Sequence, residues 1–260
     1  MEGMEININC DLGEKSKHHS IKNDPDLLKI VNSASIACGY HAGDQETMDS
    51  TIKISKKFNV SIGAHPSFKD LENFGRKRIN LSENEIKKLI IDQYDILQNI
   101  ALKNNTIVTH IKPHGALNNM ACEDINLATI LAQTIFNIDK NLIYLVPTGS
   151  KMEIAANKFN MKVASEIFAD RNYEDDGNLV SRSKTNALIL DPEIAKKHVL
   201  NMVQNQALNC LSGKMIPCKI DSVCIHGDNA TAIKIAYEIK KNFIKNRLIL
   251  KPLNKMKKFN

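Results

Sequence analysis

Short β-type runs alternate with amphipathic helical stretches along this chain of 260 residues. Strands are predicted at residues 5–11, 34–41, 60–66, 107–114, 142–147, 162–170 and 222–228, and the main helices at 44–58, 82–103, 125–136, 192–207 and 229–242. Because parallel strands need a long crossover between them, usually a helix, this alternation predicts a parallel α/β architecture. We expect a closed or nearly closed β/α barrel, with a doubly wound open sheet as the alternative.

A single β/α-barrel domain is expected over residues 1–246, because no Pro-, Gly- or Ser-rich linker and no internal repeat divides the chain. Residues 173–186, rich in Asp, Gly, Asn and Ser, are expected to form a long loop over one face. The net charge of +6 arises mainly from residues 247–260, which contain five Lys or Arg and no acidic residue. We expect this segment to be a basic C-terminal tail surrounded by solvent.

Composition excludes several classes of function. The rest of the chain is close to neutral and its cations are mostly lysine, whereas nucleic-acid recognition favours arginine, so no nucleic-acid partner is expected. No apolar run approaches the length of a membrane span, and the first residues lack the basic and apolar regions of a secretory signal. We therefore expect a cytoplasmic protein without a membrane partner, whose six cysteines are reduced.

Histidines mark the expected functional site. Five of the eight lie within or at the ends of predicted strands, namely His41, His65, His110, His114 and His226. In parallel β/α folds, catalytic groups gather at the carboxyl edge of the sheet. Histidines that converge there from four separate strands are difficult to explain by packing alone, so the pattern predicts a functional site.

The first predicted strand leads polar residues toward this edge. Asn9 and Asp11 share one face by the two-residue period of a strand, and Glu14 follows on the next loop. This pattern predicts Asp11 at the reaction centre, although Asp11 and Glu14 would alternatively cap a turn around Gly13. Beyond the second predicted strand, Asp44 is either a helix cap or a site residue.

The fourth predicted strand places a lysine between two histidines, because His110, Lys112 and His114 share one face. Such a lysine is costly to bury unless it meets an anion, and neighbouring cations would lower its pKa. We expect Lys112 to stabilise an anion, with a side chain that reaches solvent as the alternative. Beyond the third predicted strand, Gly75 and Arg76 either form an anion-binding lid or belong to a solvated basic turn.

The sixth predicted strand places Glu166 and Asp170 on one face, and Arg171 and Arg182 flank the loop that follows. The two arginines are candidates for binding a substrate carboxylate, because a guanidinium group matches a carboxylate in a bidentate way. The alternative is an internal ion pair between Asp170 and Arg171.

The seventh predicted strand places His226 and Asp228 on one face, next to the start of the last predicted helix. Backbone amides at a helix start are suited to bind an anion. The sequence contains no GxxxxGK[ST] loop, no GxSxG elbow, no HExxH motif and no strand-linked GxGxxG. The motifs of P-loop nucleotide binders, serine hydrolases and zincins are therefore missing.

Six motifs, in order and with matching spacing, resemble the LamB/YcsF family: NCDLGE, ACGYHAGD, GAHPS with FGRKR, HIKPHGAL, EIFADRNY with DGNLVSR, and CIHGD. The resemblance implies a seven-stranded β/α barrel related to the barrels of carbohydrate deacetylases. It also implies the activity of the A subunit of bacterial 5-oxoprolinase, which opens the lactam of 5-oxoproline to L-glutamate with hydrolysis of ATP. Separate B and C subunits would be its partners, and ATP with Mg²⁺ its co-substrate.

The resemblance and the strand ends together give a set of candidate residues. The expected catalytic residues are Asp11, His41, His65, Lys112, His114 and His226, and the expected substrate-binding residues are Asn9, Glu14, Asp44, Arg76, His110, Glu166, Asp170, Arg171, Arg182 and Asp228. Asp11 or a histidine such as His65 is expected to act as the base, and Lys112 to stabilise phosphate or an oxyanion. The expected acid is His114 or His226.

A bound divalent metal is a variant of this hypothesis, because Asp11, His41 and His65 make an Asp-His-His set of the kind that related barrels use. Two other classes of protein remain open. One is a stand-alone metal-dependent hydrolase of amides or acetylated sugars, and the other is a noncatalytic subunit that only binds 5-oxoproline.

Overall fold

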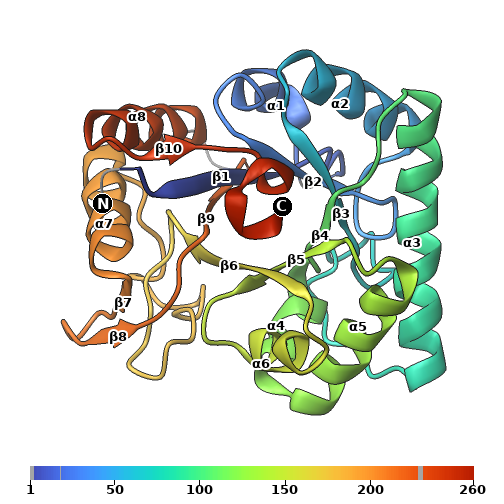
Figure 1. The fold of residues 1–260 in the computed structure, drawn as a ribbon. Helices are drawn as coiled ribbons and strands as arrows, with labels where there is room; N and C mark the ends of the chain where they lie inside the picture. Colours follow the sequence, from blue (N-terminus) through green and yellow to red (C-terminus); the bar gives the residue numbers. More distant parts are fainter. Residues whose placement is uncertain (1–2, 18, 228–230) are drawn as a thin grey trace.

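Seven parallel strands close into a barrel in a computed structural model that describes residues 3–17, 19–227 and 231–260 (Figure 1). The barrel strands are β1 (Glu5–Leu12), β2 (Ser33–Ala37), β3 (Ser61–His65), β4 (His110–Ile111), β5 (Ile143–Pro147), β6 (Lys162–Phe168) and β9 (Ser222–His226). Each strand pairs with the next in this order, and β9 returns to pair with β1, so that Asp11 lies opposite His226. The predicted closed barrel is confirmed, and the open sheet is wrong.

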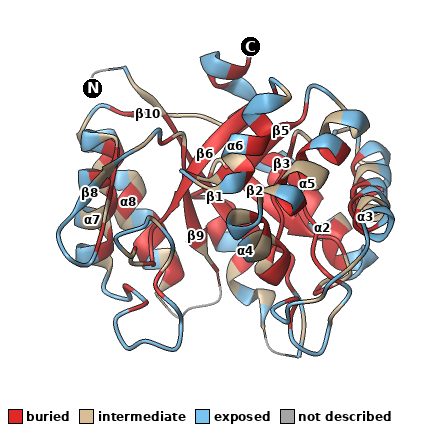
Figure 2. Ribbon diagram, turned by 90° about the horizontal axis from the view of Figure 1, so that it is seen from below, coloured by how far each residue is buried: buried red, intermediate tan, exposed pale blue. Residues whose placement is uncertain are grey.

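Helices surround the barrel and cover the outer face of its strands. They are α1 (Asp24–Leu27), α2 (Gln45–Lys57), α3 (Glu83–Lys103), α4 (Gly115–Glu123), α5 (Ile125–Ile138), α6 (Lys151–Lys158), α7 (Pro192–Asn205) and α8 (Ala232–Lys245). The strands are buried along most of their length, whereas the helices alternate buried and exposed faces (Figure 2). This pattern is expected for barrel strands, because side chains of the barrel interior cover one face of each strand and the surrounding helices cover the other. Within the described ranges, no helix is both long and apolar enough to cross a membrane.

Strand β4 is much shorter than predicted, but the chain beyond it remains extended beside β3. The amide of Lys112 donates to the carbonyl of Ala64 at 2.9 Å, and the amide of His114 donates to the carbonyl of Pro66 at 2.8 Å. These two bonds continue the register of the strand pair. They carry Lys112 and His114 to the carboxyl end of the barrel.

The connection between β6 and α7 is a long irregular segment, as predicted. It is tied down by isolated bridges that join Arg171 to Leu188 and Tyr173 to Leu179. A small antiparallel hairpin, not predicted from the sequence, follows α7 and consists of β7 (Ala207–Asn209) and β8 (Met215–Pro217).

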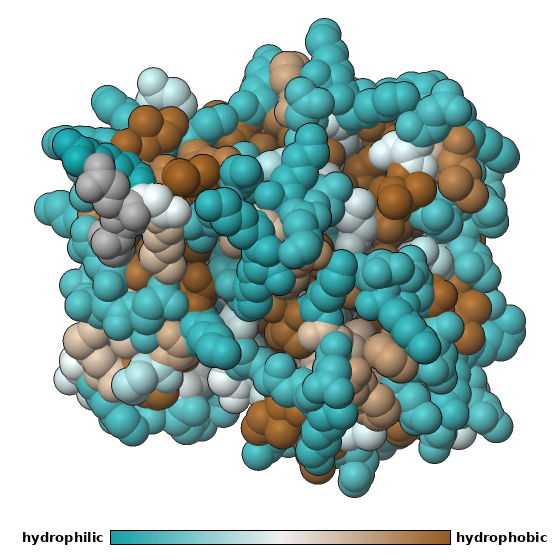
Figure 3. All heavy atoms as spheres, in the orientation of Figure 1, coloured by the Kyte–Doolittle hydropathy of each residue, from teal (hydrophilic) through white to brown (hydrophobic). Residues whose placement is uncertain are grey.

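The C-terminal segment is not a solvated tail, so that prediction is wrong. Strand β10 (Ile249–Leu250) pairs with the start of β1, and two short 3₁₀ turns, η2 (Leu253–Lys255) and η3 (Lys257–Phe259), follow it. In Figure 1 these turns lie across one end of the barrel. Figure 3 shows that the same face is largely hydrophilic, with apolar side chains in small separate areas.

Three apolar side chains of this segment close the amino-terminal end of the barrel. Leu253, Met256 and Phe259 are buried against residues of β5 and β6. Leu253 begins η2, Met256 is extended and separates the two turns, and Phe259 ends η3, so the two turns together direct all three side chains into the barrel. The lysines between them remain exposed. The charge that suggested a solvated tail therefore belongs to the outer side of a packed cap.

Leu253→Ala is expected to lower the free energy of unfolding by about 2–5 kcal/mol, because a fully buried leucine is replaced by a cavity. Urea unfolding followed by circular dichroism measures this change. Lys255→Ala, at an exposed position two residues away, is the matched control and should stay within about 0.5 kcal/mol of the wild type. Equally small effects of both substitutions would mean that the segment does not pack on the barrel.

Candidate active site

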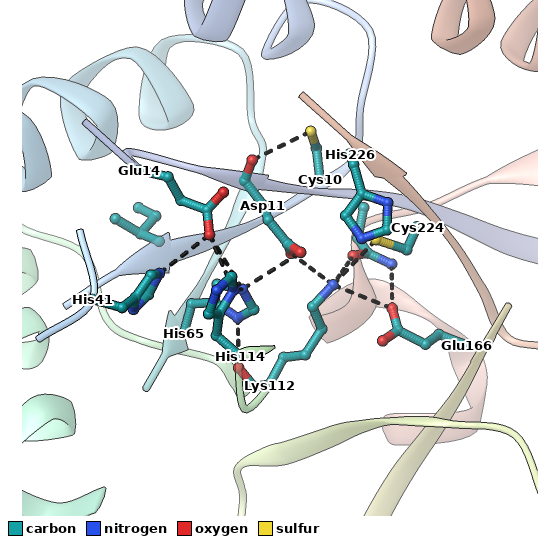
Figure 4. A network of polar contacts seen from close by, with 12 residues as sticks. Cys10, Asp11, Glu14, His41, His65, Lys112, His114, Glu166, Cys224 and His226 are labelled. Atoms are coloured by element: carbon teal, nitrogen blue, oxygen red, sulfur yellow. Dashed lines mark hydrogen bonds and ion pairs between the residues drawn. The ribbon is translucent and has the colours of Figure 1, made fainter. Parts of the chain in front are cut away.

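The carboxyl ends of the barrel strands bring most of the predicted residues into one buried polar network (Figure 4). The network has a part centred on Lys112 and a part made of Glu14 with three histidines. Asp11 lies between them: its Oδ1 is 2.6 Å from Lys112 Nζ, and its Oδ2 is 3.4 Å from His65 Nε2. Residues from β1, β3, β6 and β9, and from the loops after β1, β2 and β4, therefore share one site.

Lys112 is held by four side chains and is only 2% exposed, so it does not reach solvent. Besides the contact with Asp11, its Nζ lies 3.1 Å from Asn9 Oδ1, 3.4 Å from Glu166 Oε2 and 3.2 Å from Cys224 Sγ. Asn9 also donates to Glu166 at 3.2 Å. The ammonium group is thus surrounded by acceptors from β1, β6 and β9.

The charges around Lys112 determine its protonation. Burial lowers the pKa of Lys112, but Asp11, Cys224 and Glu166 raise it well above its ordinary value. The lowered pKa predicted from the sequence is wrong, because the nearest charged groups are carboxylates rather than histidines. These contacts therefore favour the cationic form of Lys112.

The two carboxylates that contact this cation differ from each other. Burial raises the pKa of Asp11, but His65 and Lys112 outweigh that effect and hold it below its ordinary value. Burial raises the pKa of Glu166, and its contact with Lys112 does not reverse this shift. Asp11 is therefore the ionised partner, and Glu166 is the carboxyl group that can carry a proton.

The second part of the network joins one carboxylate to three imidazoles. Glu14 Oε1 lies 3.2 Å from His41 Nε2, 3.2 Å from His114 Nδ1 and 3.7 Å from His65 Nε2. His65 Nε2 and His114 Nδ1 are 3.0 Å apart. All four residues are buried. Burial raises the pKa of Glu14, but His114 and His41 lower it well below its ordinary value.

Backbone groups fix the orientation of two of these histidines. His65 Nδ1 lies 2.6 Å from the backbone oxygen of Lys112, and His114 Nε2 lies 3.0 Å from the backbone oxygen of Phe74. The ring of His41 stacks on that of His114 with their centroids 4.0 Å apart and their planes at 9°. The histidine geometry therefore depends on the loop that contains Phe74.

The loop after β3 covers these histidines. Phe74 is buried and meets the rings of His41 and His114 edge-on. Gly75 has a φ of +65°, and a Cβ atom there would lie 2.9 Å from the Cβ of His41, so a glycine is required at this close approach. Arg76 is exposed and its guanidinium lies over the Phe74 ring at 5.0 Å. The loop thus forms a cover over the site, with Arg76 on its outer side.

A third group pairs Asp170 with His226. His226 Nδ1 lies 2.8 and 2.9 Å from the two carboxylate oxygens of Asp170, and its ring stacks parallel to Phe168. Burial lowers the pKa of His226, but Asp170 raises it above its ordinary value, with a smaller contribution of the same sign from Asp11. The side chain of His226 is 18% exposed, so this imidazole connects the buried network with solvent.

Asp44 and His110, both predicted site residues, lie outside the network. Asp44 is the N-cap of α2: its Oδ1 accepts from the amide of Thr47 at 2.8 Å, and its half-exposed side chain pairs with Lys15. His110 packs directly over Gly63 on β3, where any side chain would clash with its ring. Asp44 is therefore a helix cap and His110 fills the barrel interior.

The two arginines occupy different environments. Arg171 is buried, and its Nη2 donates to the carbonyl of Val180 at 2.7 Å, which holds the loop in place. Arg182 is exposed on the same loop. Burial raises the pKa of Asp170, but His226 and, more weakly, Arg182 lower it below its ordinary value. Arg182 therefore lies near enough to Asp170 to influence its charge. Asp228, also a predicted site residue, lies outside the described residues.

Two residues of the site were not predicted. Asp24 Oδ2 accepts from the amide of Gly13 at 2.8 Å, so Asp24, rather than Asp11 or Glu14, holds the turn after β1. Burial raises the pKa of Asp24 to about 7.

The second residue is Cys224, which the apolar run around it marks only as a small buried residue. A signal was nevertheless present: Cys224 lies two residues from His226 on one strand, so both side chains are expected on the same face.

Among the residues that the structure describes, potential metal ligands fall into two groups, in each of which the ligand atoms lie within 4.8 Å of one another. The first consists of Glu14, His41, His65 and His114, and the second of Asp11, Cys224 and His226. The predicted set of Asp11, His41 and His65 is divided between them. Glu14 takes the place predicted for Asp11, because Asp11 is already paired with Lys112.

Comparisons with known proteins agree with this architecture. The model of the LamB/YcsF family matches residues 6–258. A protein from Clostridium beijerinckii, named as the A subunit of 5-oxoprolinase, is 41% identical over 251 residues, which cover 96% of this chain and 98% of that protein. Another of the same name from Campylobacter jejuni is 42% identical over 243 residues, which cover 94% of this chain and 95% of that protein.

Solved structures show the same barrel. The lactam utilization protein from Thermus thermophilus matches with a TM-score of 0.89 and 30% identity, over 95% of this chain and 99% of that one. The catalytic domain of a peptidoglycan N-acetylglucosamine deacetylase from Eubacterium rectale shares the fold alone, with a TM-score of 0.51 and 12% identity over 95% of this chain and 87% of that one. On its sequence and its structure, this chain belongs to the LamB/YcsF family.

Proposed function

We propose that this chain is the A subunit of an ATP-dependent 5-oxoprolinase, which opens the lactam ring of 5-oxo-L-proline to give L-glutamate. Relatives about 40% identical over nearly the full chain are named as the A subunit of 5-oxoprolinase, and a lactam utilization protein has the same barrel. The observation that supports the proposal most strongly is the buried cation Lys112, held at the carboxyl end of the barrel beside an ionised carboxylate. Such a cation is suited to stabilise negative charge on an amide oxygen.

ATP makes ring opening feasible because a lactam is a stabilised amide. The lactam oxygen attacks the γ-phosphorus of ATP, and the bond from phosphorus to ADP breaks. Water then adds to the ring carbon and loses a proton to a base. The ring nitrogen accepts a proton and the C–N bond breaks, which leaves an acyl phosphate that a second water hydrolyses to glutamate and phosphate. The nitrogen has to leave before the phosphate, because loss of phosphate first would regenerate the lactam.

Three groups of the site match these requirements. We assign to Asp11, which Lys112 keeps ionised, the orientation of the attacking water and the acceptance of its proton, for which its position at the centre of the network rather than its basicity is the reason. Lys112 is suited to stabilise the charge on the lactam oxygen and on the phosphate. His226, paired with Asp170 and open to solvent, is suited to protonate the ring nitrogen. These assignments favour Asp11 over His65 as base and His226 over His114 as acid.

Binding of the substrate carboxylate is assigned to Arg182. The guanidinium of Arg171 is engaged with the backbone of Val180, whereas Arg182 is exposed near Asp170 and His226. We assign completion of the ATP site, with Mg²⁺, to the B and C subunits, because the name of the relatives implies partner subunits and this chain lacks a P-loop. A cytoplasmic location would fit this proposal, because ATP is available there.

The assembled chain with B and C subunits is expected to consume 5-oxoproline and form glutamate only when ATP is present. Chromatographic measurement of both compounds, with and without ATP, tests this directly. The cluster of Glu14 and three histidines favours one alternative, a metal-dependent hydrolase that acts alone. Release of acetate from an acetylated sugar by the isolated chain, without ATP, would support that alternative and contradict the proposal.

Lys112→Met is expected to lower kcat of the assembly by at least about a hundredfold, because it removes the cation that stabilises the developing charge. Asp11→Asn should have an effect of similar size, since it keeps the shape of the side chain and removes its charge. Lys240→Met, at a partly buried lysine of α8, is the matched control and should retain full turnover. Near wild-type turnover of both site variants, with normal circular dichroism, would instead favour a noncatalytic lactam-binding subunit.

Asp170→Asn is expected to move the alkaline limb of the kcat/KM profile to lower pH. A general acid is active only while protonated, and its activity is lost as the pH rises through its pKa. Asp170 raises the pKa of His226, so removal of its charge lowers that pKa. Burial and Arg182 continue to lower it, and Asp11 continues to raise it. A pH–rate profile of the assembly measures the shift. An unchanged alkaline limb would exclude His226 as the acid.

A further inference from the structure

Two histidine nitrogens of the site, His65 Nε2 and His114 Nδ1, face each other at hydrogen-bond distance, but neutral rings would leave no hydrogen between them. His65 Nδ1 and His114 Nε2 each lie within hydrogen-bond distance of a backbone carbonyl oxygen, at 2.6 and 3.0 Å. A carbonyl oxygen can only accept, so both of these nitrogens carry a hydrogen. A neutral imidazole has one N–H group, and the opposite nitrogens, His65 Nε2 and His114 Nδ1, therefore carry lone pairs.

These lone pairs meet at 3.0 Å, and a carboxylate oxygen joins them. Glu14 Oε1 is 3.2 Å from His114 Nδ1 and 3.7 Å from His65 Nε2. Three electron-pair donors thus converge on one point in a buried part of the protein. Such an arrangement is unfavourable unless a cation lies between them, and the cation is either a proton or a metal ion.

The distances match a metal ion of ordinary size. Nitrogen and oxygen ligands at about 2.0–2.2 Å from a tetrahedral zinc ion lie roughly 3.3–3.6 Å from one another. The three separations among Glu14, His65 and His114, from 3.0 to 3.7 Å, bracket this range. The carbonyl bonds of the two histidines fix ring orientation and raise ligand basicity, which is the usual environment of metal-binding histidines.

His41 does not complete this set as a fourth ligand. Its ring is stacked on His114 with the two planes nearly parallel, so an ion that lies in the plane of one ring lies outside the plane of the other. Its Nε2 is instead placed to donate to Glu14 Oε1 at 3.2 Å. Among the described residues its Nδ1 has no hydrogen-bond partner, whereas a metal-binding histidine usually donates through its second nitrogen.

We propose that Glu14, His65 and His114 bind one divalent transition-metal ion, for which Zn²⁺ is the best match, and that His41 is a positioning residue for Glu14. One carboxylate and two imidazoles leave a fourth position open, as in catalytic rather than structural zinc sites. Asp11 does not belong to this ligand set: its Oδ1 pairs with Lys112, and although its Oδ2 lies 3.4 Å from His65 Nε2, Asp11 falls in the other group of potential ligands, with Cys224 and His226. The proposal concerns metal binding by the isolated chain and does not depend on lactam opening.

Metal binding by the purified full chain tests the proposal. After treatment with a chelator, the chain is titrated with Zn²⁺, and the bound ion is counted by mass spectrometry and its Kd measured by calorimetry. One ion per chain is expected, and added Zn²⁺ should raise the Tm. Replacement of Zn²⁺ by Co²⁺ should give the visible absorption of a low-symmetry site with nitrogen and oxygen ligands.

Three substitutions distinguish the proposed metal ligands from the positioning residue His41. His114→Ala should abolish the stoichiometric ion and the rise in Tm, and Glu14→Gln should do the same with less risk to folding. His41→Ala should keep one ion but weaken the Kd by about 10–100-fold, as expected for a residue that acts through a ligand. His198→Ala, at a partly buried histidine of α7, is the matched control and should bind as the wild type does.

A wild-type chain that takes up no stoichiometric ion would overturn the proposal and would assign the shared position to a proton. So would folded His114→Ala and Glu14→Gln variants with an unchanged Kd. The outcome is separate from that of the proposed function: an ion bound by a chain whose assembly does not consume 5-oxoproline would leave this proposal standing and refute the other.

Discussion

The site depends on one buried cation, Lys112, and on the acceptors around it, above all the ionised Asp11, that make its burial tolerable. A buried charge without a partner is among the most costly features that a protein can contain. Here the Lys112 ammonium contacts Asp11 from β1 and Glu166 from β6, while its backbone oxygen accepts from His65 on β3. Three strands are thereby held in one arrangement around the carboxyl end of the barrel. The barrel has to close for these groups to meet, so the same contacts that make the site also favour the closed sheet.

Asp11 joins two chemically different parts of the site. One of its oxygens neutralises Lys112 and the other lies beside His65, which belongs to the group with Glu14. One part is suited to stabilise negative charge on a substrate, and the other provides converging lone pairs suited to a cation. The pair of Asp170 and His226 adds the proposed acid at the exposed side. Because these groups lie in different surroundings, carboxylates and histidines with different pKa values can take different roles at the carboxyl end of one barrel.

Much of this arrangement follows from local sequence pattern. The alternation of strand and helix predicts the barrel, and the two-residue period predicts that Asn9 and Asp11 point inward. Other features depend on contacts across the barrel that no local pattern specifies. The pKa of Lys112 is raised because its nearest neighbours come from β1 and β6, not from its own strand. The choice of Glu14 over Asp11 as partner of the histidines has the same origin. The charge of the C-terminal segment does not predict that it packs on the barrel. The signal in the sequence is that its apolar residues Leu253, Met256 and Phe259 recur every three positions.

The central claim is that 5-oxoproline reacts beside Lys112 and not elsewhere on the assembly. A crystal structure of the chain, alone or with its partner subunits, in complex with 5-oxoproline tests this most directly. The account predicts the lactam oxygen at a hydrogen-bond distance of about 2.7–3.2 Å from Lys112 Nζ and the substrate carboxylate at Arg182. A lactam bound away from the carboxyl end of the barrel, with Lys112 still contacting only Asp11, Asn9, Glu166 and Cys224, would contradict it.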